Sequence, residues 1–403
     1  MFLNQKLAFS LIEQYGEPLY VYHEETLRNR CREVSSLLAG YRHEVLYSAK
    51  ANSNPELLSI VHQEGLHVDA MSPGELFLER KAGIPVSEIF YVCNNISKEE
   101  MSLVYQQGVL LSVDSLSQLA QFGSLFPGGR IAIRLNPELG AGHHEKVITG
   151  GKKTKFGIQF DLIPEAKRLL KEYDLRLVGV NQHIGSLFMQ EDPYVDGVRN
   201  LLDIVLDHFP GLDFIDFGGG FGVPYHEGEA RLDFPSLDRK LSAVIGEFLE
   251  KYDNKEVRLH SEPGRYIVAE CGILLSRVNA VKENHGTVYV GTDIGQNVLV
   301  RPSLYDAYHE VRVIKKGKES GEQGIYTIVG NICESGDILA KKRLLPAIEE
   351  GDLIAVMNAG AYGYSMASNY TCRLRPAEVL LAMDGSVRMI RRRDTMEDLY
   401  HNL

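Results

Sequence analysis

The sequence lacks the features that mark several classes of protein. Its five cysteines form no CxxC pair, so neither a disulfide framework nor a zinc site is indicated. No apolar run approaches the roughly 20 residues that a membrane-spanning helix needs. The opening MFLNQKLAFSLIEQYGEP is too polar for a signal peptide. Acidic residues outnumber basic ones by 54 to 43, which disfavours binding to nucleic acids or anionic membranes. A cytoplasmic protein is therefore expected.

Eight short apolar runs alternate with segments whose apolar positions recur at helical spacing. The runs are EVLYSA (44–49), LHVDA (66–70), IFYVC (89–93), VLLSV (109–113), RIAIRL (130–135), RLVGVNQH (176–183), LDFIDF (212–217) and VRLHSE (257–262). Strands and helices alternating in this way are typical of a parallel (β/α)8 barrel. We therefore predict an α/β fold with a barrel over residues 30–270.

The sequence changes character after about residue 270. Strand-like runs such as GILLSRVNAVKE, TVYVGTDIG and DLIAVMNAG are separated by Gly, Asp and Asn turns, with few helical patterns among them. We predict a mostly β C-terminal domain over residues 271–403, joined by residues 1–29. The segment PLYVYHEETLRN (18–29) contains one more strand, whose local pattern is compatible with either domain.

Polar residues stand at the predicted carboxyl ends of the barrel strands, where active sites of such barrels lie. They are Lys50, Asp69, Arg134, Asn136, His183, the glycines after Phe217, and Glu262. Taken singly, a lysine there can be a surface charge and a histidine can be a core residue. Taken together, these residues favour a catalytic site.

Glycine-containing stretches follow the seventh and eighth strands, GGGFGVPY (218–225) and EPGRY (262–266). Backbone N–H groups converge on an anion where no Cβ blocks the approach, and barrel phosphate sites form after these two strands. The alternative is a pair of tight turns. With Lys50 and Glu262, the stretches suggest pyridoxal 5'-phosphate. Lys50 would hold its aldehyde as a Schiff base, Glu262 would pair with the pyridine nitrogen, and His183 could stack on the ring.

Seven motifs carry a resemblance to a known family. They are YSAKAN (47–52), HIGS (183–186), GGGFGVPY, EPGRYIVAE (262–270), RPSLYDAYH (301–309), CESGD (333–337) and GAYGYSMASNY (360–370). In this order they resemble the motifs of diaminopimelate decarboxylases. These are alanine-racemase-like (fold type III) pyridoxal phosphate enzymes related to eukaryotic ornithine decarboxylases. The resemblance extends from about Pro18 to Leu399.

The resemblance implies a role for each matching residue. The implied catalytic residues are Lys50, Cys333 and His183. The implied cofactor-binding residues are Lys50, Asp69, His183, Ser186, Gly220, Glu262, Gly264, Arg265 and Tyr362, with Glu75 nearby. The implied substrate-binding residues are Arg265, Arg301, Tyr305, Glu334 and Tyr362. Cys333 and Glu334 are implied to enter the active site of a second subunit, which would make the protein a homodimer with shared sites.

The implied activity is decarboxylation of meso-2,6-diaminopimelate to L-lysine, in lysine biosynthesis. Arginines suit a substrate with a second carboxylate, because the guanidinium fork binds a carboxylate bidentately. Decarboxylation of D-ornithine, D-lysine or a carboxylated polyamine stays open. An amino-acid racemase and a non-catalytic pyridoxal phosphate-binding protein are less favoured, and no metal is expected.

The sequence departs from the usual pattern of this family near the predicted site. Asn181 stands where histidine or cysteine is common, and Leu187 stands where glutamine or glycine is common. Leu187 is expected to add an apolar side chain beside the phosphate and the ring. The turn at Thr149, Gly150 and Gly151 is expected to shape the entrance of the active site.

Overall fold

The computed structural model describes residues 1–136, 141–142, 154–317 and 321–403, and the chain divides into two compact units. The barrel unit comprises Arg28–Val223 and Ala230–Ile267. The β unit comprises Met1–Leu27, Pro224–Glu229 and Val268–Leu403. Among the residues described, no helix is both long and apolar enough to cross a membrane.

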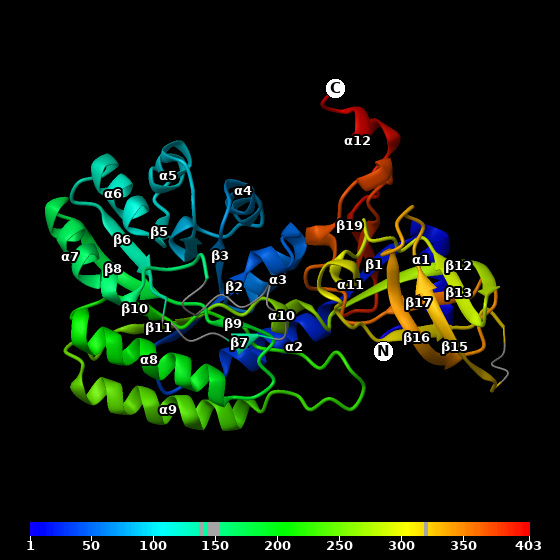
Figure 1. Ribbon diagram of the computed structural model, residues 1–403, viewed down its shortest axis with the longest axis horizontal. Helices are drawn as coiled ribbons and strands as arrows, with labels where there is room; N and C mark the ends of the chain where they lie inside the picture. The colour runs from blue at the N-terminus through cyan, green and yellow to red at the C-terminus, as the bar shows by residue number, and fades with distance from the viewer. Residues whose placement is uncertain (137–140, 143–153, 318–320) are drawn as a thin grey trace. The chain divides into compact units, whose positions relative to one another are not determined.

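Eight parallel strands close into a barrel in the order β10-β11-β2-β3-β4-β5-β6-β8 (Figure 1). They are β2 His43–Ser48, β3 His67–Ala70, β4 Ile89–Val92, β5 Leu110–Val113, β6 Arg130–Arg134, β8 Arg176–Asn181, β10 Phe214–Asp216 and β11 Arg258–Ser261. Each lies within one of the eight apolar runs or extends one residue beyond it, so the predicted (β/α)8 barrel is confirmed.

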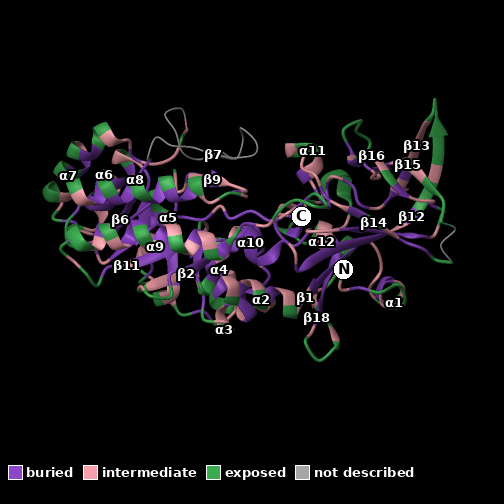
Figure 2. Cartoon of the chain, turned by 90° about the horizontal axis from the view of Figure 1, so that it is seen from below, coloured by how far each residue is buried: buried purple, intermediate pink, exposed green. Residues whose placement is uncertain are grey.

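Helices connect the barrel strands and cover the barrel. They are α2 Glu24–Ser35, α3 Pro55–Gln63, α4 Pro73–Lys81, α5 Lys98–Tyr105, α6 Leu116–Leu125, α7 Ile163–Glu172, α8 Asp192–His208, α9 Phe234–Lys251 and α10 Arg265–Val268. Local sequence fixes where several begin. The side chain of Asn54 accepts a hydrogen bond from the Glu56 N–H ahead of α3, and Ser72 does the same for Glu75 ahead of α4. Figure 2 shows the helices buried on one side and exposed on the other.

The inside of the barrel is apolar at mid-height and polar toward the carboxyl ends of its strands. An apolar cluster joins Leu46, Phe90, Ala132, Val178 and Phe214, which come from different strands. Residue 179 is a glycine that packs against the Phe214 ring. A Cβ at this position would lie 2.2 Å from the ring, so any larger side chain would clash with it. Because side chains alternate along a strand, the residues two positions beyond this cluster also point inward.

The β unit contains a nine-stranded sheet and a few short helices. Its strands are β1 Leu19–His23, β12 Gly272–Asn284, β13 Thr287–Thr292, β14 Val311–Ile314, β15 Gln323–Val329, β16 Ile338–Pro346, β17 Leu353–Val356, β18 Ala377–Leu381 and β19 Val387–Arg391. Its helices are α1 Gln5–Tyr15, α11 Arg301–Tyr305 and α12 Met396–Tyr400. A separate two-stranded sheet pairs β7 Ala141–Gly142 with β9 Gly185–Ser186.

Strand β1 belongs to the β unit, which decides the question that the local sequence left open. It pairs antiparallel with β12 and parallel with β18. The apolar side chains of β1 pack with α1 in a core cluster that includes Leu19, Val21, Ile273 and Val379. Residues at both ends of the chain are therefore needed to complete this sheet.

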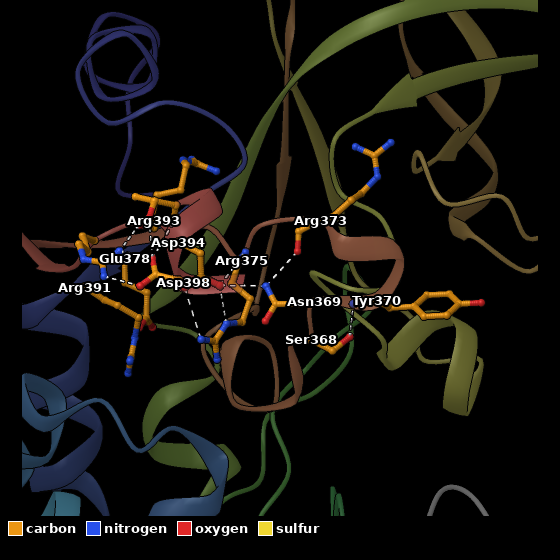
Figure 3. A network of polar contacts seen from close by, with 12 residues as sticks. Ser368, Asn369, Tyr370, Arg373, Arg375, Glu378, Arg391, Arg393, Asp394 and Asp398 are labelled. Atoms are coloured by element: carbon orange, nitrogen blue, oxygen red, sulfur yellow. Dashed lines mark hydrogen bonds and ion pairs between the residues drawn. The ribbon is translucent and has the colours of Figure 1, made fainter. Parts of the chain in front are cut away.

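A polar network holds the segment before β18 in place (Figure 3). Asp394 accepts hydrogen bonds from the Asn369 Nδ2 at 3.0 Å and the Arg375 Nε at 2.9 Å. Arg391 of β19 pairs with Glu378 of β18, which is fully buried. These contacts fix the backbone around Tyr370.

Candidate active site

Lys50 lies in a short 3-10 turn, Ala49–Ala51, that directly follows β2. The turn is fixed from both sides, since Tyr47 Oη donates to the Asn52 carbonyl at 2.9 Å and Ala49 and Ala51 are fully buried. Ser48 Oγ donates to Asp69 Oδ2 at 2.6 Å. Burial raises the pKa of Asp69, and the charge of Lys50 partly offsets that rise. Lys50 and Asp69 therefore influence each other electrostatically at the carboxyl ends of adjacent strands.

Glu262 follows β11 and is only 4% exposed. Burial, together with Asp216 and Asp69, raises its pKa well above the usual value, whereas Lys50 and Arg134 act in the opposite direction. Its Oε1 atom has no hydrogen-bond partner in the part of the chain that is described. A buried carboxyl oxygen of this kind can receive an N–H from a bound group.

His183 follows β8, and its imidazole is neutral at physiological pH. Loss of solvent around the ring lowers its pKa well below the usual value, and the positive charges of Lys50 and Arg134 lower it further. The Gly219 N–H donates to His183 Nδ1 at 3.3 Å, which leaves the proton of the neutral ring on Nε2. A flat, neutral ring fixed in this way is suited to stacking on an aromatic cofactor.

The glycine loop after β10 packs closely against the loop after β11. Gly218 and Gly220 have φ angles of +72° and +113°, which favour glycine. A Cβ at Gly219 would lie 1.9 Å from the carbonyl oxygen of Glu262, and the Glu262 N–H donates to the Gly218 carbonyl at 3.1 Å. No side chain larger than hydrogen fits at Gly219 without moving one of the two loops.

The predicted phosphate-binding residues of the barrel unit lie at these same loops. Arg265 Nη2 donates to Ser186 Oγ at 3.2 Å, joining the loop after β11 to β9. A Cβ at Gly220 would lie 2.6 Å from the Gly185 carbonyl oxygen, and one at Gly264 would lie 2.9 Å from the Ser48 Cβ. The structure therefore brings these residues to the same end of the barrel as Lys50 and Glu262.

The β unit carries a second group of predicted residues around Arg301. This arginine begins α11 and is only 3% exposed. His309 Nδ1 donates to the Met357 carbonyl at 2.9 Å, so its Nε2 is free to accept from Arg301 Nε at 3.3 Å. The guanidinium carbon also lies 5.5 Å from the ring centre of Tyr225 and 6.0 Å from that of Tyr362. The orientation of this guanidinium is therefore fixed before any ligand binds.

Cys333 and Glu334 are exposed on a loop of the β unit. Asp337 fixes the loop, because its carboxylate accepts from the N–H groups of Ile332 at 2.7 Å and Gln296 at 2.6 Å. Tyr370 donates its hydroxyl to Glu334, and this hydrogen bond lowers the pKa of that carboxyl. The loop thus presents a thiol and an ionised carboxylate on the surface of the unit.

The structure places the predicted residues in two sets. The barrel unit contains Lys50, Asp69, Glu75, His183, Ser186, Gly220, Glu262, Gly264 and Arg265, and the β unit contains Arg301, Tyr305, Cys333, Glu334 and Tyr362. Tyr305 ends α11, four residues after Arg301. The expected turn at residues 149–151 lies outside the described residues.

Sequence reasoning missed several polar residues that the structure brings to these two sets. Asp216 lies within the apolar run LDFIDF, and His309 is the last residue of the motif RPSLYDAYH. The one feature of the sequence that could have singled out Asp216 is its position, two residues before three consecutive glycines. No pattern in the sequence marked Asp216 as fully buried or His309 as a hydrogen-bond partner of Arg301.

Comparisons with known proteins match this arrangement. The family model described as pyridoxal-dependent decarboxylase, pyridoxal binding domain, matches residues 24–269. A diaminopimelate decarboxylase of Methanothermobacter thermautotrophicus is 40% identical over 399 residues, covering 97% of this chain and 92% of that protein. A diaminopimelate decarboxylase crystal structure has a TM-score of 0.92 at 30% identity, covering 99% of this chain and 96% of that one.

A second solved structure is the diaminopimelate decarboxylase of Helicobacter pylori complexed with L-lysine, with a TM-score of 0.89, 32% identity and 98% coverage of both chains. The class defined by fold and site is that of the pyridoxal-dependent decarboxylases. The chain belongs to the diaminopimelate decarboxylase family of this class. Its cofactor is pyridoxal 5'-phosphate, and the partnerless Glu262 oxygen and the neutral His183 ring fit that group.

Proposed function

We propose that this enzyme decarboxylates meso-2,6-diaminopimelate to L-lysine and carbon dioxide, a step of lysine biosynthesis. Relatives named for this activity support the proposal, as does the bound L-lysine of the Helicobacter pylori protein. The observation on this chain that carries it is Arg301. A buried guanidinium, already oriented by His309, is what the second carboxylate of a diamino dicarboxylate requires.

The residues of the barrel unit would hold the cofactor. Bound pyridoxal phosphate stabilises the negative charge left on the α-carbon when carbon dioxide departs. Lys50 would anchor it, with Asp69 close to that lysine, and Glu262 would face its ring nitrogen. His183 would lie against the ring as a neutral imidazole. The remaining proposed contacts, on the phosphate, are Ser186, Gly220, Gly264 and Arg265 of the barrel unit and Tyr362 of the β unit.

The residues of the β unit would act on the substrate. Arg301 would bind the distal carboxylate, with Tyr305 and Tyr362 beside it. We assign to Arg265 a further contact with a substrate carboxylate. Glu334, which is ionised because Tyr370 lowers its pKa, would bind the distal ammonium. The thiol of Cys333 would return a proton to the α-carbon.

We further propose a homodimer in which Cys333 and Glu334 serve the active site of the partner subunit. Both residues are exposed on a loop that Asp337 and Tyr370 hold in one conformation. A fixed loop that displays two reactive groups is suited to insertion into a second chain. We also propose a cytoplasmic location, which agrees with five free cysteines, since disulfides are rare in that compartment.

Carbon dioxide release across a panel of diamino acids tests the proposed substrate. The panel contains meso-diaminopimelate, L-lysine, D-lysine, L-ornithine and D-ornithine. Diaminopimelate should give by far the highest kcat/KM. Arg301→Ala should lose roughly ten- to a hundredfold on diaminopimelate, because a hydrogen bond to a charged group is worth about 1.5–3 kcal/mol. The loss on substrates without a second carboxylate should be much smaller.

The matched control is Arg312→Ala, which removes an arginine of β14 that pairs with Glu310 on the surface. It should leave all rates unchanged. Equal losses by Arg301→Ala on both substrate classes would contradict the proposal. They would favour a decarboxylase whose substrate has no distal carboxylate.

A further inference from the structure

The β unit contains a cavity of about 400 Å³, here called the β-unit pocket. Its charged and amide lining residues are Glu17, Asp293, Asn297, Asn331, Arg373 and Arg393. All six belong to the β unit, and none is among the residues proposed for the cofactor or the substrate. Strand β12 pairs with β1 through Leu275 and with β13 from Val278. Glu17 precedes β1 and Asp293 follows β13, so the pocket lies where β12 changes its partner.

Asn297 is buried in the wall of this pocket with no partner for its amide. It is only 3% exposed, and neither its Nδ2 nor its Oδ1 has a hydrogen-bond partner among the residues described. Its backbone is fixed, since the Ser368 N–H donates to the Asn297 carbonyl at 2.9 Å. Tyr20 Oη donates to the next carbonyl, that of Val298, at 2.8 Å. A buried amide without partners costs free energy that an apolar residue would avoid, which indicates a group bound in the pocket.

Two more oxygens of the lining lack a donor. Asn331 Nδ2 donates to Asp293 Oδ1 at 2.8 Å, which orients that amide and leaves its Oδ1 without a donor in the described chain. A Cβ at Gly295 would lie 2.8 Å from Asn297 Oδ1 and 3.1 Å from Asn331 Oδ1, so both oxygens face the same glycine. Glu17 Oε1 accepts from an arginine of β12 at 3.3 Å, whereas its buried Oε2 has no donor among the described residues. Such oxygens can accept the N–H groups of an ammonium.

Arg373 and Arg393 supply the positive charges of the pocket. Arg373 Nη2 donates to the Asn331 carbonyl at 2.9 Å, and Arg393 Nη2 donates to the Pro18 carbonyl at 2.6 Å. Within the described chain each guanidinium makes this one hydrogen bond and no ion pair. Asn369 Nδ2 donates to the Arg373 carbonyl and to the carboxylate that follows Arg393, both at 3.0 Å (Figure 3). The two segments are thus held together, and the remaining N–H groups can bind a carboxylate.

The rest of the pocket is mainly apolar, with Pro18, Val298, Leu374 and Met396 in its lining. Its two positive and two negative side chains balance each other. Because charges in a partly buried site are favoured when they are paired, the matching ligand has one positive group, one negative group and no further charge. The volume of the pocket falls within the range of about 300–1,000 Å³ that small-molecule sites occupy. An α-amino acid with an apolar side chain meets these requirements.

We propose that the β-unit pocket binds an α-amino acid with an apolar side chain. Arg373 and Arg393 bind its carboxylate. The side-chain oxygens of Asn297, Asn331 and Glu17 accept from its ammonium, and its side chain lies against the apolar part of the lining. Binding at this site uses none of the residues proposed for decarboxylation, so it goes beyond the proposed function.

The pocket adjoins the loop that carries Cys333 and Glu334. Asn331 lies two residues before Cys333, and its carbonyl is held by Arg373. Tyr370, three residues before Arg373, donates to Glu334. A ligand that contacts Asn331 and Arg373 therefore acts on both segments that position this loop. Given the proposed role of Cys333, binding should change kcat for diaminopimelate with little change in KM.

Isothermal titration calorimetry of the full-length enzyme with its cofactor bound, with L-leucine as the probe, tests the site. Wild type should bind L-leucine, and Asn297→Leu should weaken this binding by about tenfold or more, because hydrogen bonds to a charged group are strong. Arg301→Ala, which alters the proposed substrate site, should bind L-leucine as wild type does. No binding to wild type, or wild-type affinity in Asn297→Leu, would overturn the proposal.

Two derivatives of the probe test the ligand chemistry. N-acetyl-L-leucine lacks the ammonium and L-leucinamide lacks the carboxylate, so each should bind at least about tenfold more weakly than L-leucine. Equal affinity for the acetylated form would reduce the pocket to a site for anions and overturn the assignment of an amino acid.

Urea unfolding separates a binding role of Asn297 from a structural one. Without L-leucine, Asn297→Leu should be at least as stable as wild type, because it removes a buried amide that has no partner. A large loss of stability would show a structural role and overturn the role assigned to Asn297. Arg373→Ala is a second variant at the pocket and should also weaken L-leucine binding. Its control is Arg392→Ala, which removes a surface arginine paired with Asp398 and should leave the affinity unchanged.

Steady-state kinetics with L-leucine present test the effect on the loop. A rise in KM for diaminopimelate with kcat unchanged would mean competition at the active site and would overturn a separate site. Because the calorimetry requires no turnover, a failure of the proposed reaction and a failure of this site give different results.

Discussion

At the scale of single residues, burial changes the chemistry of acids that sequence patterns treat as ordinary surface groups. Glu79 on α4 is fully buried, and neither of its carboxyl oxygens has a hydrogen-bond partner among the described residues. Burial, with smaller contributions from Asp69 and Glu75, raises its pKa to about 9. Glu79 is therefore protonated at neutral pH and acts as a neutral polar group within the core.

We predict that Glu79→Gln makes the stability of the barrel less sensitive to pH. The pKa of Glu79 in the folded chain lies above its usual value of 4.5. Its contribution to stability is therefore complete below about pH 4.5 and is lost as pH rises toward 9. Over that window the free energy of unfolding should fall by up to about 1.4 kcal/mol per pH unit. Glutamine has no proton to lose.

Urea unfolding at several pH values between 5 and 9 measures this effect. The glutamine variant should show a flatter dependence than wild type over this range and a higher stability near its alkaline end. Asp203→Asn, which changes an exposed acid of α8, is the control and should reproduce the wild-type slope. A Glu79→Gln slope equal to that of wild type would contradict the prediction.

The barrel-unit residues that could be predicted share one property, their position at a strand end. Lys50, Asp69, His183 and Glu262 follow from the rule that barrel active sites lie at carboxyl ends. Asp216 also ends a strand, but the apolar residues around it gave no reason to separate it from the core. Burial and hydrogen bonding depend on contacts between distant strands, which a local pattern does not contain.

At the scale of elements, the sequence pattern of α4 predicts that a helix forms but not which of its faces is buried. The pattern PGELFLERKAG predicts a helix, and the structure has one over Pro73–Lys81. The pattern does not predict its orientation, since Phe77 is 59% exposed whereas Glu79 is fully buried. Leu76 and Glu79 share the inward face because they are three positions apart. Similarly, the local sequence of β1 does not predict its pairing with β12 and β18, because its partners lie far away in the chain.

The loop between β9 and α8 carries strain at Leu187, whose φ angle is +68°. A side chain with a Cβ is disfavoured there by about 1–2 kcal/mol relative to glycine. We therefore predict that Leu187→Gly is more stable than Leu187→Ala by about 1 kcal/mol, since both variants lose the same apolar atoms beyond Cβ. Chemical denaturation of the two variants measures the difference.

The matched pair is Met189→Gly and Met189→Ala in the same loop. Met189 is not among the non-glycine residues with positive φ. There the order should be reversed, with glycine less stable by roughly 0.5–1 kcal/mol because of its greater freedom in the unfolded chain. The same sign at both positions would show that the backbone at Leu187 is not strained.

At the scale of the whole molecule, the proposed active site requires two chains, and this can be tested by mixing two defective enzymes. Lys50→Ala and Cys333→Ala should each be nearly inactive alone. After subunit exchange, random pairing makes half the dimers mixed, and each mixed dimer has one site free of both defects. About a quarter of wild-type sites should then be restored.

Lys50→Ala mixed with Glu262→Gln is the control, because both residues lie in the barrel unit of one chain. Each site of that mixed dimer keeps one defect, so carbon dioxide release should not recover. No recovery in either mixture, after subunit exchange has been demonstrated, would place Cys333 in the active site of its own chain.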